Sequence, residues 1–173
     1  MTVATSQQVR IRTYCTEDRD AVLCLYRDGV VDGHVNANAQ TPDLLDVPSH
    51  YLSSCNNHFW VAELDDGLVG MIGVAAVPTR HIARIRRLRV GPAFHNNIAL
   101  GDQLLETAMA HCKRHGFLKV LVDTHFRDDH ALFVLSRFGF QYTRRKRGDS
   151  HDVLEFYANL YYTPEDELFG LCH

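Results

Sequence analysis

A junction between a strand and a helix, near residues 90–101, offers backbone groups that could bind a phosphate. Residues 87–92, RLRVGP, alternate apolar and basic side chains as a strand does, and Pro92 would end its ladder. Apolar residues then recur at helical spacing, at Ile98, Leu104, Leu105, Ala108, Met109 and Cys112. The first turn of such a helix presents free N–H groups and the positive end of the helix dipole, which attract an anion. The alternative is an ordinary polar loop.

Small residues at this junction favour the phosphate ligand. Ala99 and Gly101 would let the backbone approach a pyrophosphate, and Asn96 could add a side-chain amide. The expected donors are the N–H groups of Asn96, Asn97, Ile98, Ala99, Leu100 and Gly101. The chain contains neither G-x-x-x-x-G-K-[ST] nor G-x-G-x-x-G, which argues against a P-loop hydrolase and a dinucleotide-binding dehydrogenase.

Titratable residues close a short apolar strand that we expect over residues 118–124. Asp123 and His125 stand at its end, where the ligand clefts of α/β proteins lie. His125 titrates near neutral pH and is a candidate general base, with Asp123 beside it; the alternative is a surface histidine. Tyr157 is a candidate general acid among the late tyrosines, although aromatic residues on late strands commonly fill a core.

Arginines dominate the expected strand over residues 81–90, which offers no acid. On a regular strand Arg84 and Arg86 would share one face and Arg87 and Arg89 the other, unless a bulge intervenes. One pair, which we take to be Arg84 and Arg86, could bind a carboxylate or phosphate on a substrate. The alternative is that the arginines form salt bridges with the helix after the first strand.

Composition indicates one domain spanning residues 1–173, with a core over about 9–162. The chain has 173 residues, is 46% hydrophobic and carries a net charge of −3. No apolar run is long enough to span a membrane, and the N-terminus MTVATSQQ lacks the pattern of a secretory signal. We therefore expect a cytoplasmic protein that binds neither nucleic acid nor a membrane, with the basic run 144–147 in a solvated hairpin loop.

Cysteine and histidine usage argues against metals and disulfides. The five cysteines are scattered and lack C-x-x-C pairing, which argues against a disulfide framework and against a zinc knuckle. His111 and His115 stand four apart on the expected helix, but the intervening CKR lacks the glutamate of H-E-x-x-H. We expect a solvated helix face there and no metal.

The order of expected elements is β-α-α-β-β-β-α-β-α-β-β. Thr16 is the expected N-cap of the first helix, and DDG between two apolar runs predicts a hairpin. The strands are expected over residues 9–16, 58–64, 68–77, 81–90, 118–124, 140–146 and 151–162, and the helices over 16–29, 42–54, 98–115 and 128–139. The fold class is α/β (α+β), with a mixed central sheet of about seven strands flanked by about four helices.

This order, with the phosphate-type turn after the fourth strand, resembles the GNAT superfamily of N-acetyltransferases over residues 9–162. Three fragments carry the resemblance. NNIALG fits the turn motif Q/R-x-x-G-x-G/A, with Asn96 and Ala99 as departures from it. DDHALFVLSRFGF lies on N-x-x-A-x-x-L-Y-x-x-x-G-F, through Asp128, Ala131, Val134, Leu135, Gly139 and Phe140, and L-x-V-x-P is present as Leu88, Val90 and Pro92.

The resemblance implies the GNAT-type fold and acetyl-coenzyme A (acetyl-CoA) as cosubstrate. Its pyrophosphate would sit at the turn, and its pantetheine arm would bond the free edge of Leu88, Arg89 and Val90, with the thioester near Leu88. Asp128 and Leu135 would complete the coenzyme site. The implied reaction is acetyl transfer to the primary amine of a small molecule or peptide, by direct attack in a ternary complex.

One departure leaves other functions open. Family members often protonate the leaving thiolate with the tyrosine of the L-Y pair, and this chain has Leu135 there. One alternative is a coenzyme-binding module of the same fold that does not catalyse, and another is an interaction domain that binds no coenzyme. The tail after residue 162 could pack on the domain or on a second copy of the chain, as a homodimer.

Overall fold

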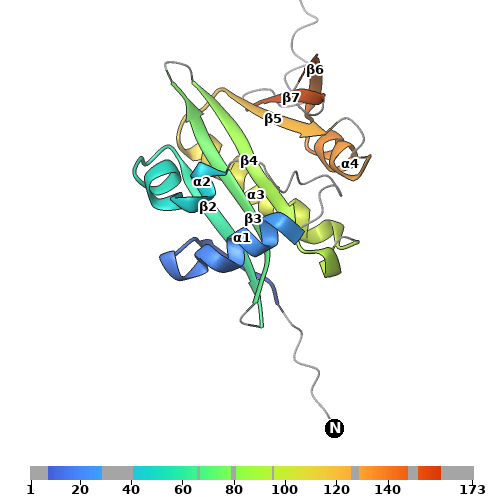
Figure 1. Ribbon diagram of the computed structural model, residues 1–173. Helices are drawn as coiled ribbons and strands as arrows, with labels where there is room; N and C mark the ends of the chain where they lie inside the picture. Colours follow the sequence, from blue (N-terminus) through green and yellow to red (C-terminus); the bar gives the residue numbers. More distant parts are fainter. Residues whose placement is uncertain are drawn as a thin grey trace, which may run out of the picture.

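One twisted sheet organises the chain, which a computed structural model describes over residues 8–28, 41–65, 67–78, 81–94, 96–125, 129–147 and 152–160 (Figure 1). Its seven strands lie in the order β1-β2-β3-β4-β5-β7-β6. The strands are β1 (Arg10–Thr13), β2 (His58–Leu64), β3 (Gly67–Val77), β4 (Ile82–Val90), β5 (Lys119–His125), β6 (Gln141–Lys146) and β7 (Val153–Asn159). The helices are α1 (Arg19–Asp28), α2 (Pro42–Leu45), α3 (Ile98–Arg114) and α4 (Asp129–Arg137), with short turns η1 (Thr16–Asp18), η2 (Pro48–Leu52) and η3 (Pro92–Phe94).

The sheet is mixed, as the sequence predicts. Neighbouring strands run antiparallel except β4 and β5, which are parallel and are joined through α3. The predicted hairpin of β2 and β3 is confirmed, with Leu64 opposite Gly67. The predicted pairing of the last two strands is also confirmed, and β7 is the strand that bonds β5, so β6 lies at the edge.

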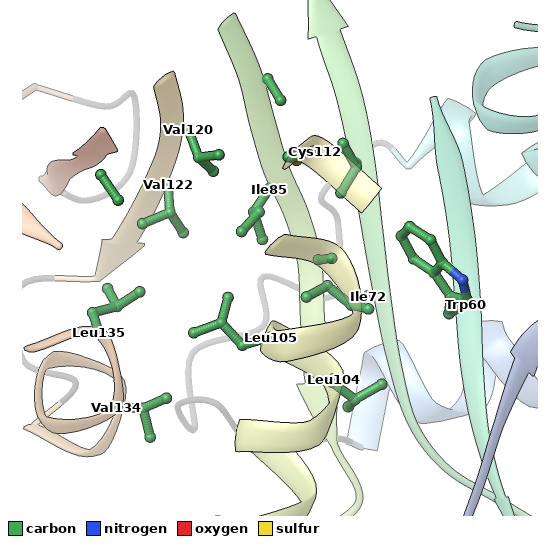
Figure 2. Close-up of a cluster of buried hydrophobic side chains, with 14 of the residues drawn as sticks. Trp60, Ile72, Ile85, Leu104, Leu105, Cys112, Val120, Val122, Val134 and Leu135 are labelled. Carbon is green, nitrogen blue, oxygen red and sulfur yellow. The ribbon is translucent and has the colours of Figure 1, made fainter. Parts of the chain in front are cut away.

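Two hydrophobic layers cover the two faces of the sheet. Helix α3 packs on one face, which we call the α3 face, where Leu104 and Leu105 contact a cluster that includes Ile72 and Ile85 (Figure 2). Helices α1 and α2 cover the opposite face, which we call the α1 face (Figure 1). Its core consists of Tyr14, Val22, Leu25, Tyr26, Leu44, Val47, Tyr51, Phe59, Val61 and Met71. Ile98, expected in the apolar stripe of α3, is 37% exposed because it opens the helix.

The N-cap of the first helical segment is Cys15, and the prediction of Thr16 is wrong. The carboxylate of Asp18 accepts the N–H of Cys15 at 2.9 Å. Arg12 donates two hydrogen bonds to the same carboxylate, at 2.7 and 2.8 Å. These bonds hold the pKa of Asp18 to about 2, and they place Thr16 inside the turn η1 instead of before it.

The basic run near residue 145 belongs to a strand, so the predicted hairpin loop is wrong for most of it. Arg144, Arg145 and Lys146 are the last residues of β6 and pair with β7. Acids on or next to β7 compensate their charge: Arg144 contacts Glu155 at 3.1 Å, and Arg145 donates to Asp152 at 2.6 Å. Cross-strand ion pairs of this kind explain why a basic sequence can form an edge strand here.

His111 is buried, so the predicted solvated face of α3 is wrong at this position. Its ring lies 4.0 Å from that of His115, 5.1 Å from that of Trp60 and 5.5 Å from that of His58. The apolar stripe of α3 continues through His111 because the residue follows Ala108 by three positions. The described ranges contain no group of three or more His, Cys, Asp or Glu that could hold a metal ion. They also contain no helix that is both long and apolar enough to cross a membrane.

Candidate active site

β4 and β5 part from one another halfway along their length. Their parallel ladder runs from Ile82 with Lys119 to Ile85 with Val122 and stops there. β4 continues to Val90 while bonded to β3, and β5 continues to His125 while bonded to β7. The facing edges beyond the last pair, which we call the splay, therefore carry no ladder bonds between these two strands. Figure 1 shows β5 diverging from β4 toward α4.

A bulge interrupts β4 at the start of the splay. Arg86 is opposite Gly73 and Arg89 is opposite Met71, so Arg87 and Leu88 together face the single residue Ile72. Arg87 has a φ of 58°, in the left-handed region that side chains other than glycine rarely adopt. Bulges of this kind re-aim the side chains that follow them.

The bulge places the arginines of β4 on one face, so the division between two faces that a regular strand would give does not apply here. Ala83 and Ile85 are buried in the cluster on the α3 face, which sends Arg84 and Arg86 to the α1 face. After the extra residue, the alternation is shifted by one position. Leu88 and Val90 pack against the α3 cluster, while the guanidinium groups of Arg87 and Arg89 each lie 5.1 Å from the ring centroid of Tyr26 on α1.

A buried ion pair holds the bulge to α2. Arg87 donates to both oxygens of Asp43, at 2.9 and 2.7 Å. The hydroxyl of Tyr51 donates to the same carboxylate at 2.7 Å. Burial would raise the pKa of Asp43, but the hydrogen bonds from Arg87 and Tyr51 outweigh it and keep that pKa below its ordinary value. The charge of Arg87 is therefore compensated inside the protein.

Arg84 is compensated by acids of the neighbouring strands. It donates to Asp123 of β5 at 2.7 Å and to Glu155 of β7 at 3.3 Å. Lys146 joins the same group, with a bond of 3.2 Å to Asp123 and a contact with Glu155. Salt bridges were the alternative to substrate binding for these arginines, and Arg84 makes them with strands instead of with the first helix.

Arg86 differs from both of its basic neighbours. It is exposed, and it makes no hydrogen bond or ion pair with any residue in the described part of the chain. Its cross-strand neighbour is Gly73, where a Cβ would meet the Tyr51 ring at 2.9 Å. The sequence does not distinguish Arg86 from Arg84, whereas in the structure Arg86 has no compensating acid among the described residues.

Two of the three catalytic candidates stand at the splay. Asp123 is the first residue of β5 past the last β4–β5 pair, and His125 is the last residue of β5, paired with Val153. Of His125 only the backbone is described. Tyr157 lies on β7, with β5 between it and β4, and its hydroxyl donates to Gln141 of β6 at 2.8 Å. Asp128, expected at the coenzyme site, lies outside the described residues.

The first turn of α3 fits an anionic group. Its N-cap, Asn97, makes no side-chain capping hydrogen bond, so the helix geometry leaves the N–H groups of Ile98 and Ala99 without a capping acceptor from that residue. At Gly101, a Cβ would meet nothing within 4 Å, which leaves room beside the helix. Asn96 precedes this turn and is exposed, and Leu100 is buried beneath it.

Leu135 of α4 is part of the core near the splay. It is 3% exposed and belongs to the same cluster as Val122 and Leu105 (Figure 2). Thr124, to which sequence reasoning gave no role, is buried on the same face of β5 as Val122. The alternation of Val120, Val122 and Thr124 was the signal that could have placed it there.

Other residues of the site carried no sequence signal. Asp43 of α2 accepts from Arg87 although the two residues are 44 positions apart, and Tyr51 of η2 donates to Asp43 in turn. Glu155 is 4% exposed and contacts Arg84, Arg144 and Lys146. Partners at such separations depend on strand order and register, which spacing along the chain does not reveal.

Comparisons with solved structures support this architecture. An acetyltransferase of the GNAT family from Staphylococcus aureus Mu50 aligns with a TM-score of 0.77 at 21% identity, covering 88% of this chain and 99% of the other. The ribosomal-protein-S18-alanine N-acetyltransferase of Escherichia coli aligns with a TM-score of 0.71 at 13% identity, covering 92% and 98%. At these identities the likeness shows a shared fold.

Curated relatives are more similar in sequence over a shorter stretch. N-acetyltransferase family 8 member 3 of Rattus norvegicus is 33% identical over 105 residues, which are 58% of this chain and 46% of the relative. N-acetylaspartate synthetase of Mus musculus is 32% identical over 72 residues, or 40% and 24% of the two chains. The matched part of this chain spans about half the length, or less, of these relatives.

A family model decides the classification. The model of the acetyltransferase (GNAT) family matches residues 5–140, a range that includes the splay, the bulge and the first turn of α3. The sequence resemblance and the seven-stranded mixed sheet lead to the same assignment. This chain therefore belongs to the GNAT family of acetyltransferases.

Proposed function

We propose that this protein is an acetyl-coenzyme A dependent N-acetyltransferase that acts on the primary amine of a small molecule or peptide. The observation that carries the proposal is that β4 parts from β5, ends at Val90, and leads directly into α3, whose first turn at Ile98 has no side-chain cap. One feature offers free strand edges, and the other offers N–H donors to a phosphate. Family membership and the names of the relatives support the same activity.

In this proposal the first turn of α3 holds the pyrophosphate of the coenzyme. Its donors are the N–H groups around Ile98 and Ala99, and Gly101 keeps the approach open. The free edge of β4 from Leu88 to Val90 bonds the amides of the pantetheine arm. The coenzyme supplies an acetyl carbon activated by its bond to sulfur.

Residues of the chain then remove the proton of the amine and stabilise the negative charge that develops on the carbonyl oxygen. The amine nitrogen forms a bond to the acetyl carbon while the bond from that carbon to sulfur breaks. Starting from the ammonium, the nitrogen loses one proton before the attack and a second to solvent as the amide forms, and the sulfur gains one, so that one proton is released overall. A lysine-like amine has a pKa of about 10.4, so a proton must leave before the attack. Asp123 orients the ammonium, His125 accepts its proton, and the backbone N–H near Leu88 donates to the carbonyl oxygen as negative charge develops.

The proton that goes to sulfur is assigned to solvent. Leu135 has no hydroxyl to donate, and the hydroxyl of Tyr157 already donates to Gln141 of β6. Leu135 is also the observation that favours the second candidate, a coenzyme-binding module of the same fold that does not catalyse. The two candidates share the coenzyme site and differ only in turnover.

Calorimetric titration with acetyl-coenzyme A, followed by a thiol-release assay over a panel of amines, tests the proposal. We expect binding and amine-dependent release of coenzyme A. Binding without release from any amine would establish the non-catalytic module. An absence of binding would contradict both candidates and leave an interaction domain of this fold.

A further inference from the structure

The splay has opposite charges on its two sides at the α1 face. Arg86 of β4 and Asp123 of β5 are the first residues past the last ladder pair, Ile85 with Val122. Arg86 is on the α1 face because it alternates with Ile85, and Asp123 is on that face because it alternates with Val122. Arg86 and Asp123 therefore stand on either side of the site where the acetyl group would be transferred, and both oxygens of Asp123 already contact cations, Arg84 and Lys146.

Charge compensation singles out Arg86 among the basic residues of β4. Asp43 takes both donors of Arg87, and Asp123 and Glu155 take those of Arg84. The guanidinium group of Arg87 is therefore bonded to α2 at the bulge, and that of Arg84 is bonded to β5 and β7. Arg86 has no ion pair with a described acid, and its fork of N–H groups is available to an oxyanion.

Among the described residues, no acid forms an ion pair with Arg86, whereas Arg84 and Arg87 are each paired with acids. Asp43 is buried and paired with Arg87, and Asp46 accepts the N–H of Ser49 at 3.2 Å. Arg86 also acts on the neighbouring phenol: burial raises the pKa of Tyr51, and the charge of Arg86 works against that rise. An approaching polycation would meet this charge before reaching the transfer site, whereas an anion would be attracted.

We propose that the acceptor carries an oxyanion, either a carboxylate or a phosphate, within a few bonds of its amine; this inference rests on the proposed function. Arg86 binds the oxyanion, and Asp123 faces the ammonium. An amino-acid-like zwitterion brings its carboxylate to Arg86 and its ammonium to the side of Asp123, a carboxylate that also contacts Arg84 and Lys146. A carboxamide leaves Arg86 without its ion pair, and a diamine brings a second cation against it. Arg86 is thus the residue that selects the acceptor, and the bulge is the feature that leaves it outside the network of compensated arginines.

Matched amines test the inference in a thiol-release assay at moderate salt. The carboxylate arm is alanine, its carboxamide and 1,2-diaminopropane, and the phosphate arm is phosphoethanolamine against ethanolamine. We expect kcat/KM for the anionic member of at least one arm to exceed that of its neutral and cationic counterparts by about tenfold or more, as one charge-assisted pair implies. Comparing the arms identifies the oxyanion.

Variants assign the effect to Arg86. Arg86→Ala should raise KM for the preferred anionic amine about tenfold or more while KM for acetyl-coenzyme A stays within about twofold. Arg10→Ala, at an exposed arginine of β1, is the matched control and should change neither value. Arg86→Lys should recover part of the loss, because it restores the charge without the planar fork.

Two outcomes separate this inference from the proposed function. Thiol release that is equal for anionic, neutral and cationic amines, or that is unchanged in Arg86→Ala, overturns the inference and leaves the acetyltransferase intact. If no amine supports thiol release, calorimetry of the same amines on the protein saturated with coenzyme A decides. Binding of an anionic amine that Arg86→Ala abolishes supports the role of Arg86, and equal affinity in both proteins, or no affinity in either, overturns it.

Discussion

Arg87 and Asp43 form a bidentate ion pair between β4 and α2, and this pair fastens the one strained residue of the bulge. The two N···O distances are 2.9 and 2.7 Å, and the backbone of Arg87 has a φ of 58°. A left-handed arginine costs on the order of 1 kcal/mol or more, so the surrounding structure must hold it. The free edge near Leu88, where the acetyl group would lie, therefore depends on a side-chain contact with a helix of the opposite layer.

Replacing Asp43 should destabilise the protein and disturb the bulge. Asp43→Asn leaves the half-buried Arg87 without its counter-charge and should lower the free energy of unfolding by about 3 kcal/mol. Urea denaturation measures this change. Asp20→Asn, at an exposed acid of α1, is the control and should alter stability by less than about 0.5 kcal/mol. Equal stabilities of the two variants would show that the ion pair is not holding the bulge.

Gly101→Glu should abolish binding of acetyl-coenzyme A without unfolding the protein. The new carboxylate would meet the pyrophosphate at the first turn of α3, and the space beside Gly101 accepts a side chain because a Cβ there meets nothing within 4 Å. Calorimetry measures binding, and thermal unfolding checks the fold. Gly101→Ala adds a methyl group without charge and is the matched control, with a much smaller loss of affinity. Tight binding by Gly101→Glu would move the phosphate site elsewhere.

Tyr157→Phe should leave kcat within about twofold of the parent value. The hydroxyl of Tyr157 donates to Gln141, so removing it loses a hydrogen bond and lowers the free energy of unfolding by about 1 kcal/mol. The substitution removes no group at the splay. Steady-state kinetics with a saturating acceptor measure the effect. A fall of kcat by tenfold or more, together with the loss of a basic limb in the pH profile, would make Tyr157 the acid that protonates sulfur.

Stability should decline as the pH falls below about 6.5, through His58 of β2 and His111 of α3. Burial lowers the pKa of His58 and of His111, and the charges of His115 and Arg114 lower them further. The unfolded chain then binds more protons than the folded one between the folded pKa values and the ordinary value of about 6.5. The stabilisation by neutral rings is therefore complete above that value and is lost on acidification.

Urea denaturation at pH 7.5 and 5.5 measures this dependence. The free energy of unfolding should fall less between these pH values in His111→Gln than in the parent, because one buried imidazole no longer has to stay neutral. His81→Gln, at an exposed site before β4, is the control and should show the parent's decline. A parental decline in His111→Gln as well would assign the effect to other groups.

Local patterns predicted the elements, and long-range contacts decided the site. The hairpin of β2 and β3, the helix α3 and the turn at Gly101 are readable because their signals are adjacent in the chain. The role of Leu135 as a departure from the family's tyrosine is readable for the same reason. The side of the sheet that Arg89 takes was not, because one extra residue in β4 reverses every side chain after it.

Compensation of charge was equally invisible in the sequence. In the sequence nothing distinguishes Asp43, Asp123 and Glu155 from the other carboxylates. Only the sheet order brings Asp123 and Glu155 to Arg84, and only the packing of α2 on the sheet brings Asp43 to Arg87. His111 shows the same limitation, because a polar residue in an apolar stripe can be solvated or buried with partners. The ring contacts with Trp60 and His58 settle the question for this chain.

Because β4 parts from β5, amides on the two edges of β4 should exchange their hydrogens at different rates. Past Ile85, the amides of β4 that point toward β3 stay in a ladder, while those that point toward the splay have no partner on β5. The latter should exchange quickly in the free protein and slow down when a pantetheine arm bonds that edge. The ladder of β5 with β7 runs unbroken from Lys119 to His125 and provides the slow internal reference. Exchange at the edge of β4 that faces the splay would thus report binding of the coenzyme, and exchange at the edge bonded to β3 would report global stability.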